Sequence, residues 1–485
     1  MSDHLIFHKS HPGKIGYSLP SLDVPEVSPS DVVGSEFLRK KELHLPEVTE
    51  PEVVRHYTNL STKNHHVDKD VYPLGSCTMK YNPKVNDAMA NLTGFSLVHP
   101  NQLMKTVQGA LAVISGLEEQ LKAITGMSRF TLQPSAGSQG ELVGILIMHK
   151  YHELQGNQKK TILIPDTAHG TNPASVTMAG YEAVQVRSNK KGRVDIEDLK
   201  NKLTDNVAGM MLTQPNTLGL FENDILEITR MVHEAGGLMY MDGANLNAIL
   251  GLVRPMDMGF DIVHINLHKT FSTPHGGGGP GSGPIGVVEN LVKFLPIPLI
   301  DEKDGQYYIN DDLPNSIGRV HTYFGNFGIL VRAYTYILLL GIEGIRTISR
   351  QAILNANYLK ARVKNAYDLF QDDHCMHEFV LTAVKQKKAG VKALDIGKRL
   401  LDYGFHAPTV YFPINVPEAM MVEPTESESV ESLDRFADAL IKIDDEAKNN
   451  PDLLKNAPYS TPVRRLDEVT ANRSLTLRWT PDLEG

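Results

Sequence analysis

The chain has 485 residues, of which 41% are hydrophobic and 22% charged, a composition typical of soluble globular proteins. Its net charge of −9 provides no positive field for a polyphosphate backbone, so we do not expect nucleic acid as a partner. Cys77 and Cys375 can form at most one bridge, which excludes a disulfide framework and favours a reducing cytoplasm.

The N-terminus has no basic stretch followed by an apolar run, so we expect no signal peptide. The richest apolar stretch, residues 327–345, is interrupted by Arg332 and Glu343. It falls short of the roughly 18–20 uncharged apolar residues that span a bilayer. We interpret it as a buried helix and expect no membrane partner.

We expect an arm and two domains. Residues 1–70 are rich in proline and charge, which predicts an extended N-terminal arm with short helices. Residues 71–330 predict a large α/β domain, and residues 331–485 predict a small C-terminal α+β domain.

Short apolar runs alternate with amphipathic segments between about residues 130 and 290. Strands are predicted at residues 161–164, 183–186, 207–212, 238–241 and 262–265. Helices are predicted between them at residues 195–203 and 224–235. This alternation predicts a mostly parallel sheet covered by helices, in which ligands bind where the strands end.

The pattern changes in the C-terminal third. Helices are predicted from Leu330, at about residues 353–370, and at residues 391–401 and 432–447. Extended segments are predicted at residues 378–384 and 409–413. These elements are the basis for the predicted small domain.

The strand that begins at Ile262 delivers His268 and Lys269 to its end, just before a glycine-rich loop. A lysine there could form a Schiff base with an aldehyde cofactor, although a lone lysine is more often an exposed loop residue. The preceding strand ends at Asp242, which could otherwise cap a helix. Pyridoxal phosphate needs both an amine and a carboxylate that faces its pyridine nitrogen. The pair therefore points to this cofactor.

Three further polar loops follow predicted strands or precede a helix. Ser138 and Glu141 have the spacing of a capping box at the start of an apolar helix, whose N-terminus favours phosphate. His169 could stack on a cofactor ring or act as an acid or base, or it could be an ordinary loop histidine. Thr213 offers a hydroxyl group at the end of another strand. Packing alone hardly explains so many polar strand ends.

The chain resembles fold type I pyridoxal-phosphate enzymes, an α/β fold with a mostly parallel sheet. Within them it is similar to the glycine cleavage system P-protein family, and most like the second subunit of its two-subunit bacterial form. The motifs that carry the resemblance are residues 73–83, 135–141, 169–175, 241–248, 266–281, 325–328 and 404–413.

The resemblance implies that pyridoxal 5'-phosphate is the cofactor and that Lys269 and His169 are catalytic. Lys269 would carry the cofactor covalently, Asp242 would pair with the pyridine nitrogen, and His169 would stack on the ring. The other cofactor contacts that it implies are Ala136, Gly137, Ser138, Thr213 and His268. Candidates for the glycine and lipoyl pocket are Thr78, His99, Arg319 and Asn326. No metal is expected.

The implied reaction is that of an aminomethyl-transferring oxidoreductase of glycine catabolism. Glycine would lose its carboxylate as CO2, and its aminomethyl group would pass to the lipoyl arm of the H-protein. The chain resembles only the second half of a fused P-protein, which implies a companion subunit 1 and an α2β2 heterotetramer. Two alternatives stay open: another fold type I decarboxylase or a desulfurase using Cys77, and a scaffold subunit without chemistry.

Overall fold

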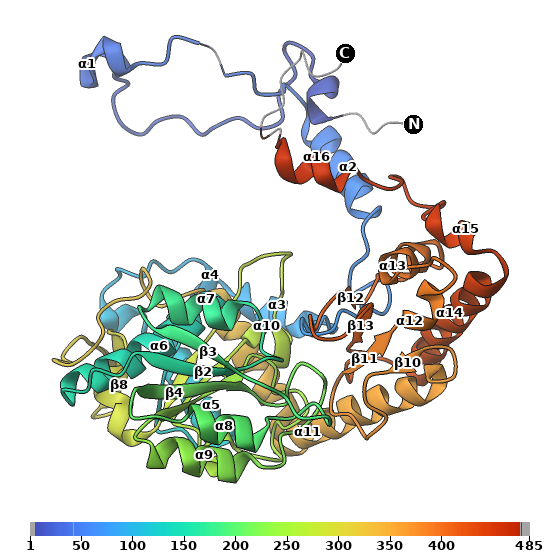
Figure 1. The fold of residues 1–485 in the computed structure, drawn as a ribbon. Helices are drawn as coiled ribbons and strands as arrows, with labels where there is room; N and C mark the ends of the chain where they lie inside the picture. Colours follow the sequence, from blue (N-terminus) through green and yellow to red (C-terminus); the bar gives the residue numbers. More distant parts are fainter. Residues whose placement is uncertain (1–4, 42, 476, 478–485) are drawn as a thin grey trace. The chain divides into compact units, whose positions relative to one another are not determined.

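The computed structural model describes residues 5–41, 43–475 and 477 (Figure 1). Residues 1–4, 42, 476 and 478–485 lie outside the described residues. They include the start of the predicted arm and the end of the predicted small domain. The chain divides into two units, residues 1–65 and residues 66–485, each of which is considered by itself.

The first unit contains short helical segments joined by extended chain. These are η1 (Ile6–Lys9), α1 (Pro29–Val32), η2 (Ser35–Phe37) and α2 (Glu50–Ser61). The backbone N–H of Thr49 donates to Glu52 Oε2 at 2.9 Å, which fixes the start of α2.

The second unit is built on a seven-stranded sheet with the strand order β1-β7-β6-β5-β4-β2-β3. The strands are β1 (Arg129–Thr131), β2 (Thr161–Pro165), β3 (Glu182–Val186), β4 (Val207–Thr213), β5 (Leu238–Gly243), β6 (Ile262–Ile265) and β7 (Ile285–Val287). From β6 to β3 every pair is parallel, whereas β7 pairs antiparallel with both β6 and β1. The predicted strands are confirmed to within about two residues, and β1 and β7 are additions to them.

Both faces of this sheet are buried because successive side chains point to opposite sides. Ile162 and Tyr240 belong to the cluster with α6 (Gly137–Leu154) and α7 (Thr171–Met178). Met239 and Met241 belong to a second cluster, together with residues of α8 (Ile196–Lys202) and α9 (Ile225–Glu234). Figure 1 shows α6 and α7 on one face and α8 and α9 on the other.

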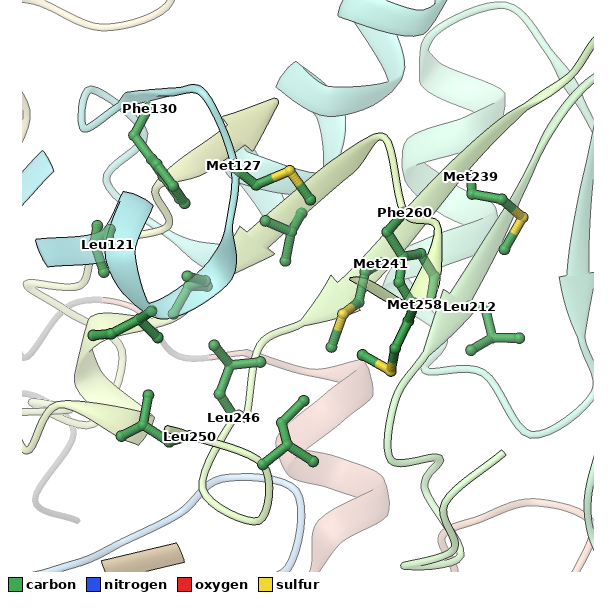
Figure 2. Packing of buried hydrophobic residues seen from close by; sticks show 14 of the residues in the cluster. Leu121, Met127, Phe130, Leu212, Met239, Met241, Leu246, Leu250, Met258 and Phe260 are labelled. Atoms are coloured by element: carbon green, nitrogen blue, oxygen red, sulfur yellow. The ribbon is translucent and has the colours of Figure 1, made fainter. Parts of the chain in front are cut away.

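The second cluster is rich in methionine. Figure 2 shows Met239, Met241 and Leu212 from the sheet with Met258 and Phe260 from the segment that leads into β6. All five side chains are at most 4% exposed. Burial of this extent fixes the register of the strands, because a shift by one residue would move every side chain to the other face.

Further elements surround the sheet or cross its edges. They are α3 (Lys84–Ala90), α4 (Thr93–Ser96), η3 (Met104–Thr106), α5 (Gln108–Thr125), η4 (Pro255–Met258), α10 (Leu267–Thr270), η5 (Glu289–Phe294) and the antiparallel pair β8 (Leu299–Lys303) and β9 (Gln306–Asn310). Most important for the site is α10, a single turn that follows β6 directly.

The longest helical segment is α11 (Phe327–Val363), which comprises two helices joined across a kink; two helices were predicted for this region, the second from about residue 353. Gly341 interrupts it with φ 58°, a conformation that favours glycine. Among the described residues, α11 is the one helix long and apolar enough to cross a membrane by length and composition, contrary to the sequence-based expectation. Leu330 and Ile337 nevertheless pack in the core of the large sheet, as expected of a buried helix.

The C-terminal part has its own antiparallel sheet, in the strand order β10-β11-β13-β12. Its strands are β10 (Asp368–Leu369), β11 (Phe379–Thr382), β12 (Thr409–Val410) and β13 (Ala419–Val422). Its helices are α12 (Val384–Lys387), α13 (Ala393–Asp402), α14 (Val430–Asn449), α15 (Pro451–Lys455) and α16 (Glu468–Arg473). The helix predicted at about residues 353–370 ends earlier than expected. Residues Asp368–Leu369 form strand β10, which pairs with β11.

Candidate active site

A cavity of about 240 Å³ lies where β2, β4, β5 and β6 end. Predicted residues that line it are Gly137, Ser138, His169, Thr213, Asp242 and Lys269. The structure therefore gathers most of the predicted cofactor residues at one place. This is the arrangement expected of a parallel sheet, in which the carboxyl ends of the strands meet at one edge.

Lys269 lies in α10, which the chain enters immediately after β6. Its Nζ donates to the backbone carbonyl of Ser76 at 2.6 Å. Ser76 has φ 68°, in the left-handed region of backbone conformation, and it also lines the cavity. The amine is thus held at the cavity by main-chain atoms of a loop far away in the sequence.

Asp242 ends β5 and is 4% exposed. Asn172 Nδ2 donates to its Oδ2 at 3.0 Å, and the backbone N–H of Ala244 donates to its Oδ1 at 3.1 Å. His264 Nε2 lies 3.3 Å from Oδ1, and His264 Nδ1 lies 2.8 Å from the hydroxyl oxygen of Tyr240. A buried chain of polar groups therefore fixes the orientation of this carboxylate.

The charge of Asp242 is maintained despite its burial. Burial alone would raise the pKa of the carboxyl group, but His264, the hydrogen bond from Asn172 and the positive charge of Lys269 lower it more. The net effect is a lowered pKa. A charged carboxylate at this position suits a partner that carries a proton on an aromatic nitrogen.

The first turn of α6 forms one wall of the cavity. The helix begins at Gly137 with Ala136 as its N-cap. A Cβ atom at Gly137 would lie 2.5 Å from the side chain of Asn266, and one at Gly283 would lie 2.3 Å from the carbonyl oxygen of Ala136. These glycines allow close packing around a helix N-terminus, where unpaired N–H groups favour an anion.

The capping box predicted for Ser138 and Glu141 is wrong, because the helix starts at Gly137 without a side-chain cap. Glu141 instead accepts hydrogen bonds from Thr171 Oγ1 at 2.8 Å and Ser175 Oγ at 3.1 Å. Its carboxylate ties α6 to α7. Ser138 is consequently free of the capping role and lines the cavity.

His169 lies in the loop between β2 and α7, at the cavity. Its Nδ1 lies 2.8 Å from Thr171 Oγ1 and 3.2 Å from the backbone nitrogen of Thr171. The ring also makes an edge contact with Phe412, with centroids 5.6 Å apart. The loop thus fixes the position of this histidine beside the C-terminal part.

Thr213 and His268 have different surroundings. Thr213 Oγ1 is buried at the cavity and has no hydrogen-bond partner among the described residues. His268 is absent from the lining of the described cavity, and its Nδ1 accepts from the backbone N–H of Ser282 at 3.4 Å. Burial, followed by the charges of Lys269 and His275, lowers the pKa of His268 to about 3, so the imidazole is neutral.

The residues present fit pyridoxal phosphate. The cavity combines an amine, a charged carboxylate and a helix N-terminus with close-packed glycines. Thr213 Oγ1 and Asn266 Oδ1 are buried there without a partner in the described part of the chain. Buried polar atoms are normally hydrogen-bonded, so these two indicate groups that await a polar ligand.

The candidates for the glycine and lipoyl pocket lie outside the described lining of this cavity. Thr78 is buried and donates to Glu423 Oε2 at 2.9 Å, which places it directly behind the cavity. Asn326 occupies the N-cap position of α11 without a side-chain capping bond, and its Nδ2 donates to the carbonyl oxygen of Gly281 at 2.7 Å. The roles of these two residues stay predictions.

His99 and Arg319 lie elsewhere. His99 lines a second, more apolar cavity of about 430 Å³ and makes an edge contact with Tyr323. Arg319 is half exposed and pairs with Asp311 at 2.6 Å. Neither residue approaches Lys269 in this arrangement of the chain.

Sequence reasoning missed three residues of the C-terminal part, His377, Glu378 and Glu423. His377 and Glu378 line the cavity, and the ligand-type atoms of all three lie within 4.8 Å of one another. Glu378 precedes β11 and Glu423 follows β13, two strands that pair Phe379 with Val422. Only this register brings the two carboxyl groups together, so no local sequence signal could have revealed them.

Known proteins resemble this chain along nearly its whole length. The aminotransferase class-V family model matches residues 136–278, and the model for the C-terminal domain of glycine dehydrogenase matches residues 348–459. The chain is 58% identical over 477 residues to the probable glycine dehydrogenase (decarboxylating) subunit 2 of Caldanaerobacter subterraneus, covering 98% of each chain. It is 56% identical to the protein of the same name from Chloroherpeton thalassium, covering 99% of this chain and 98% of that one.

Two solved structures share the fold. A crystal structure of glycine decarboxylase (P-protein) of the glycine cleavage system, in inhibitor-bound form, matches with a TM-score of 0.73 at 19% identity, covering 85% of this chain and 94% of that one. A NifS-like protein matches with a TM-score of 0.61 at 15% identity, covering 77% of this chain and 99% of that one. At these identities the likeness establishes the fold, which is that of type I pyridoxal-phosphate enzymes, as expected.

Proposed function

The chain belongs to the family of glycine dehydrogenase (decarboxylating) subunit 2. We therefore propose that it decarboxylates glycine in the glycine cleavage system. The cofactor of the family is pyridoxal 5'-phosphate. The observation that carries the proposal is the presence of Lys269 and the charged Asp242 in one cavity, at the ends of neighbouring strands.

Each residue of the cavity has a role in this proposal. Lys269 would attach the cofactor, and Asp242 would hold a proton on its pyridine nitrogen. When bound, the cofactor supplies an electron sink for the electron pair that remains when the carboxylate of glycine leaves as CO2. Ala136, Gly137 and Ser138 would hold the phosphate at the start of α6, with Thr213 as a further donor.

His169 would cover the ring face, because its loop fixes the imidazole at the cavity. His268 would support the site from behind as a neutral imidazole. Thr78, Asn326, His99 and Arg319 stay candidates for the pocket of glycine and the lipoyl arm. Of these four, Thr78 has the strongest support, since it bonds to Glu423 next to the cavity.

We also propose that the chain works with a companion subunit in an α2β2 heterotetramer. The support is the name of its relatives, which are described as subunit 2. The aminomethyl group would pass to the lipoyl arm of the H-protein, whose disulfide is an oxidant of the kind this transfer requires. A reducing cytoplasm suits the two cysteines, both of which are free thiols.

The division into an arm (1–70), a large domain (71–330) and a small domain (331–485) is kept as part of the proposal. All strands of the seven-stranded sheet lie between Arg129 and Val287, and those of the four-stranded sheet lie between Asp368 and Val422. The boundary at residue 330 falls in the first turn of α11, so this helix would connect the two domains.

Two alternatives have less support. A desulfurase requires a nucleophilic thiolate, but burial, as the largest cause, raises the pKa of Cys77. A scaffold subunit would not require a buried, charged Asp242 beside Lys269. Another amino-acid decarboxylase of this fold is best separated by its substrate.

The test is the exchange of labelled bicarbonate into the carboxyl group of glycine. We expect exchange when the chain is combined with pyridoxal phosphate, the companion subunit and lipoylated H-protein. Omission of any one component should reduce it. No exchange in the complete mixture, together with CO2 release from another amino acid, would overturn the proposal in favour of a different decarboxylase.

A further inference from the structure

Two buried carboxyl groups face each other at the cavity. Glu378 is 4% exposed and Glu423 is fully buried. Glu378 directly precedes Phe379 and Glu423 directly follows Val422, the residues that pair at this end of the antiparallel ladder of β11 and β13. Ionisation of both carboxyl groups at such a site is energetically unfavourable, because repulsion and desolvation both oppose the second charge.

The hydrogen bonds of the two groups are unequal. Glu423 accepts from Asn245 Nδ2 at 2.9 Å through Oε1 and from Thr78 Oγ1 at 2.9 Å through Oε2. Glu378 accepts from the backbone N–H of Ser76 at 2.8 Å through Oε2. Donors stabilise an ionised carboxylate, so the better supplied Glu423 is favoured as the charged member and Glu378 as the protonated one.

Glu378 is connected to Lys269 through one residue. The N–H of Ser76 donates to Glu378, and the carbonyl oxygen of the same residue accepts from Lys269 Nζ at 2.6 Å. Glu378 and Lys269 both line the cavity, whereas Glu423 lies behind it. The protonated group therefore faces the same space as the amine.

We propose that Glu378 and Glu423 hold one proton between them, and that Glu378 exchanges it with the nitrogen atoms that meet at Lys269. This inference rests on the proposed function, because it assigns a proton carrier to the replacement of Lys269 by the amino group of the substrate. Glu378 would be a further catalytic residue, and Glu423 a positioning residue that acts through it.

The protons balance. The ammonium group of an incoming amino acid loses one proton before its nitrogen can form a new bond, and the released amine of Lys269 gains one. Glu378, which faces the cavity, can donate its proton to Lys269 Nζ and take up the proton that the substrate ammonium releases, while Glu423 stays ionised. The pair returns to its starting state, and no electrons are exchanged.

The surrounding charges support a proton on the pair. Burial, the largest cause, raises the pKa of Glu378, and the charge of Glu423 raises it further. The N–H of Ser76 and the charge of Lys269 oppose this rise. Burial also raises the pKa of Glu423, against its hydrogen bonds from Asn245 and Thr78 and the charge of Lys269.

Other titratable groups nearby are His377, Cys77 and Glu426. Burial lowers the pKa of His377 to about 3, so it is neutral and adds no charge. The pKa of Cys77 is raised, which keeps its thiol neutral. Glu426 adds to the rise at Glu423. Lys269 is therefore the principal positive group facing the pair among the described residues.

The first experiment measures the proton directly, without substrate or cofactor. Infrared difference spectra of the cofactor-free protein, with and without 13C-labelled glutamate, report the C=O stretch of a protonated glutamic acid. We expect this band at neutral pH in the wild type. It should be lost in Glu378→Gln. In Glu423→Gln it should disappear at a lower pH than in the wild type, because the charge of Glu423 no longer adds to the effect of burial on the pKa of Glu378.

Glu222→Gln is the matched control. Glu222 is buried with a raised pKa, but it accepts from the backbone N–H groups of Val194 and Asp224 and does not line the cavity that contains Lys269. Any band that this variant removes is subtracted from the comparison. A band that persists in Glu378→Gln, or that has an unchanged pH dependence in Glu423→Gln, would overturn the shared proton.

The second experiment measures the role of the proton in bicarbonate exchange. We expect Glu378→Gln to lower the exchange rate by about 10²- to 10⁴-fold, the usual effect of losing a positioned acid or base. Glu378→Asp should restore part of the rate and shift the alkaline limb of the pH profile, which a merely structural role would not do. Covalent loading of Lys269 with pyridoxal phosphate checks that each variant has folded.

The outcomes separate the two proposals. A wild type without glycine exchange but with the infrared band would sink the proposed function and leave the shared proton standing. An active wild type whose Glu378→Gln variant keeps its rate and pH profile would overturn the catalytic role of Glu378.

Discussion

Lys80 Nζ donates a hydrogen bond of 2.8 Å to the backbone carbonyl of Thr270, the residue that follows Lys269. The same ammonium group forms an ion pair of 2.6 Å with Glu426 and donates to Asn247 Oδ1 at 3.0 Å. The Lys80 side chain is 2% exposed. This buried charge links the turn that carries Lys269 to the C-terminal part of the chain.

Lys80→Met should destabilise the protein by about 3–5 kcal/mol, because it leaves Glu426 buried without its partner. Urea unfolding of the cofactor-free protein measures the change. Lys84→Met is the control, since Lys84 pairs with Asp68 at the surface and should contribute less than about 1 kcal/mol. Equal effects of the two substitutions would contradict the assignment. Adding Glu426→Gln to Lys80→Met should recover part of the loss.

Lys269→Ala should abolish covalent attachment of pyridoxal phosphate while the fold remains, because its amine bonds only to the Ser76 carbonyl among the described residues. Borohydride reduction followed by peptide mass spectrometry locates the attached cofactor. Lys293→Ala, at an exposed position of η5, should keep full attachment. If the reduced adduct is found on another lysine of the Lys269→Ala variant, the assignment of Lys269 as the attachment site is wrong.

Thr213→Val should have opposite effects on stability and on cofactor binding. The hydroxyl is buried without a partner among the described residues, so its removal should stabilise the cofactor-free protein by about 1 kcal/mol. Loss of a hydrogen bond to the cofactor should weaken binding by about 2- to 12-fold.

Thr273→Val separates the two effects. Thr273 Oγ1 is also buried without a described partner, but it does not line the cavity. Its replacement should stabilise the protein and leave cofactor affinity unchanged. Thermal unfolding and a fluorescence titration with pyridoxal phosphate measure the two quantities. Weaker binding in Thr273→Val alone would exclude Thr213 as the contact.

Stability should fall as the pH decreases below about 6.5, the ordinary value for histidine. Burial lowers the pKa of both His268 and His377 to about 3, so between these two values the unfolded chain binds more protons than the folded one. Each histidine contributes a slope of at most about 1.4 kcal/mol per pH unit. Urea unfolding at pH 4 to 7 should show a shallower dependence in His377→Gln. An unchanged slope would show that this imidazole is not buried in its neutral form.

The sequence predicted the central strands well for a physical reason. Strands buried on both faces, such as β4 (Val207–Thr213) and β5 (Leu238–Gly243), are continuous apolar runs bounded by polar residues. The polar residues that follow them, including Asp242, were therefore easy to place at the edge of the sheet. Lys269, Asp242, His169 and the start of α6 could all be located in this way.

Features that depend on pairing between distant segments could not be located. The short antiparallel strands β1 and β7 carry too few residues for a periodic signal. Two helices were predicted where α11 lies, but the break between them is at Gly341 and not near residue 353. Glu378 and Glu423 are 45 positions apart, and only the register of β11 and β13 brings them to the cavity.

At position 76 the bonds to both Glu378 and Lys269 are made by the N–H and C=O groups of the peptide backbone, held at φ 68°. Proline alone would delete the N–H group, and no substitution deletes the C=O group, so other substitutions can disturb the link only through the conformation of the chain. Glycine or asparagine, which tolerate this conformation, should preserve the link, whereas valine or isoleucine should break it. A functional residue of this kind is invisible to alanine scanning that looks only for side chains.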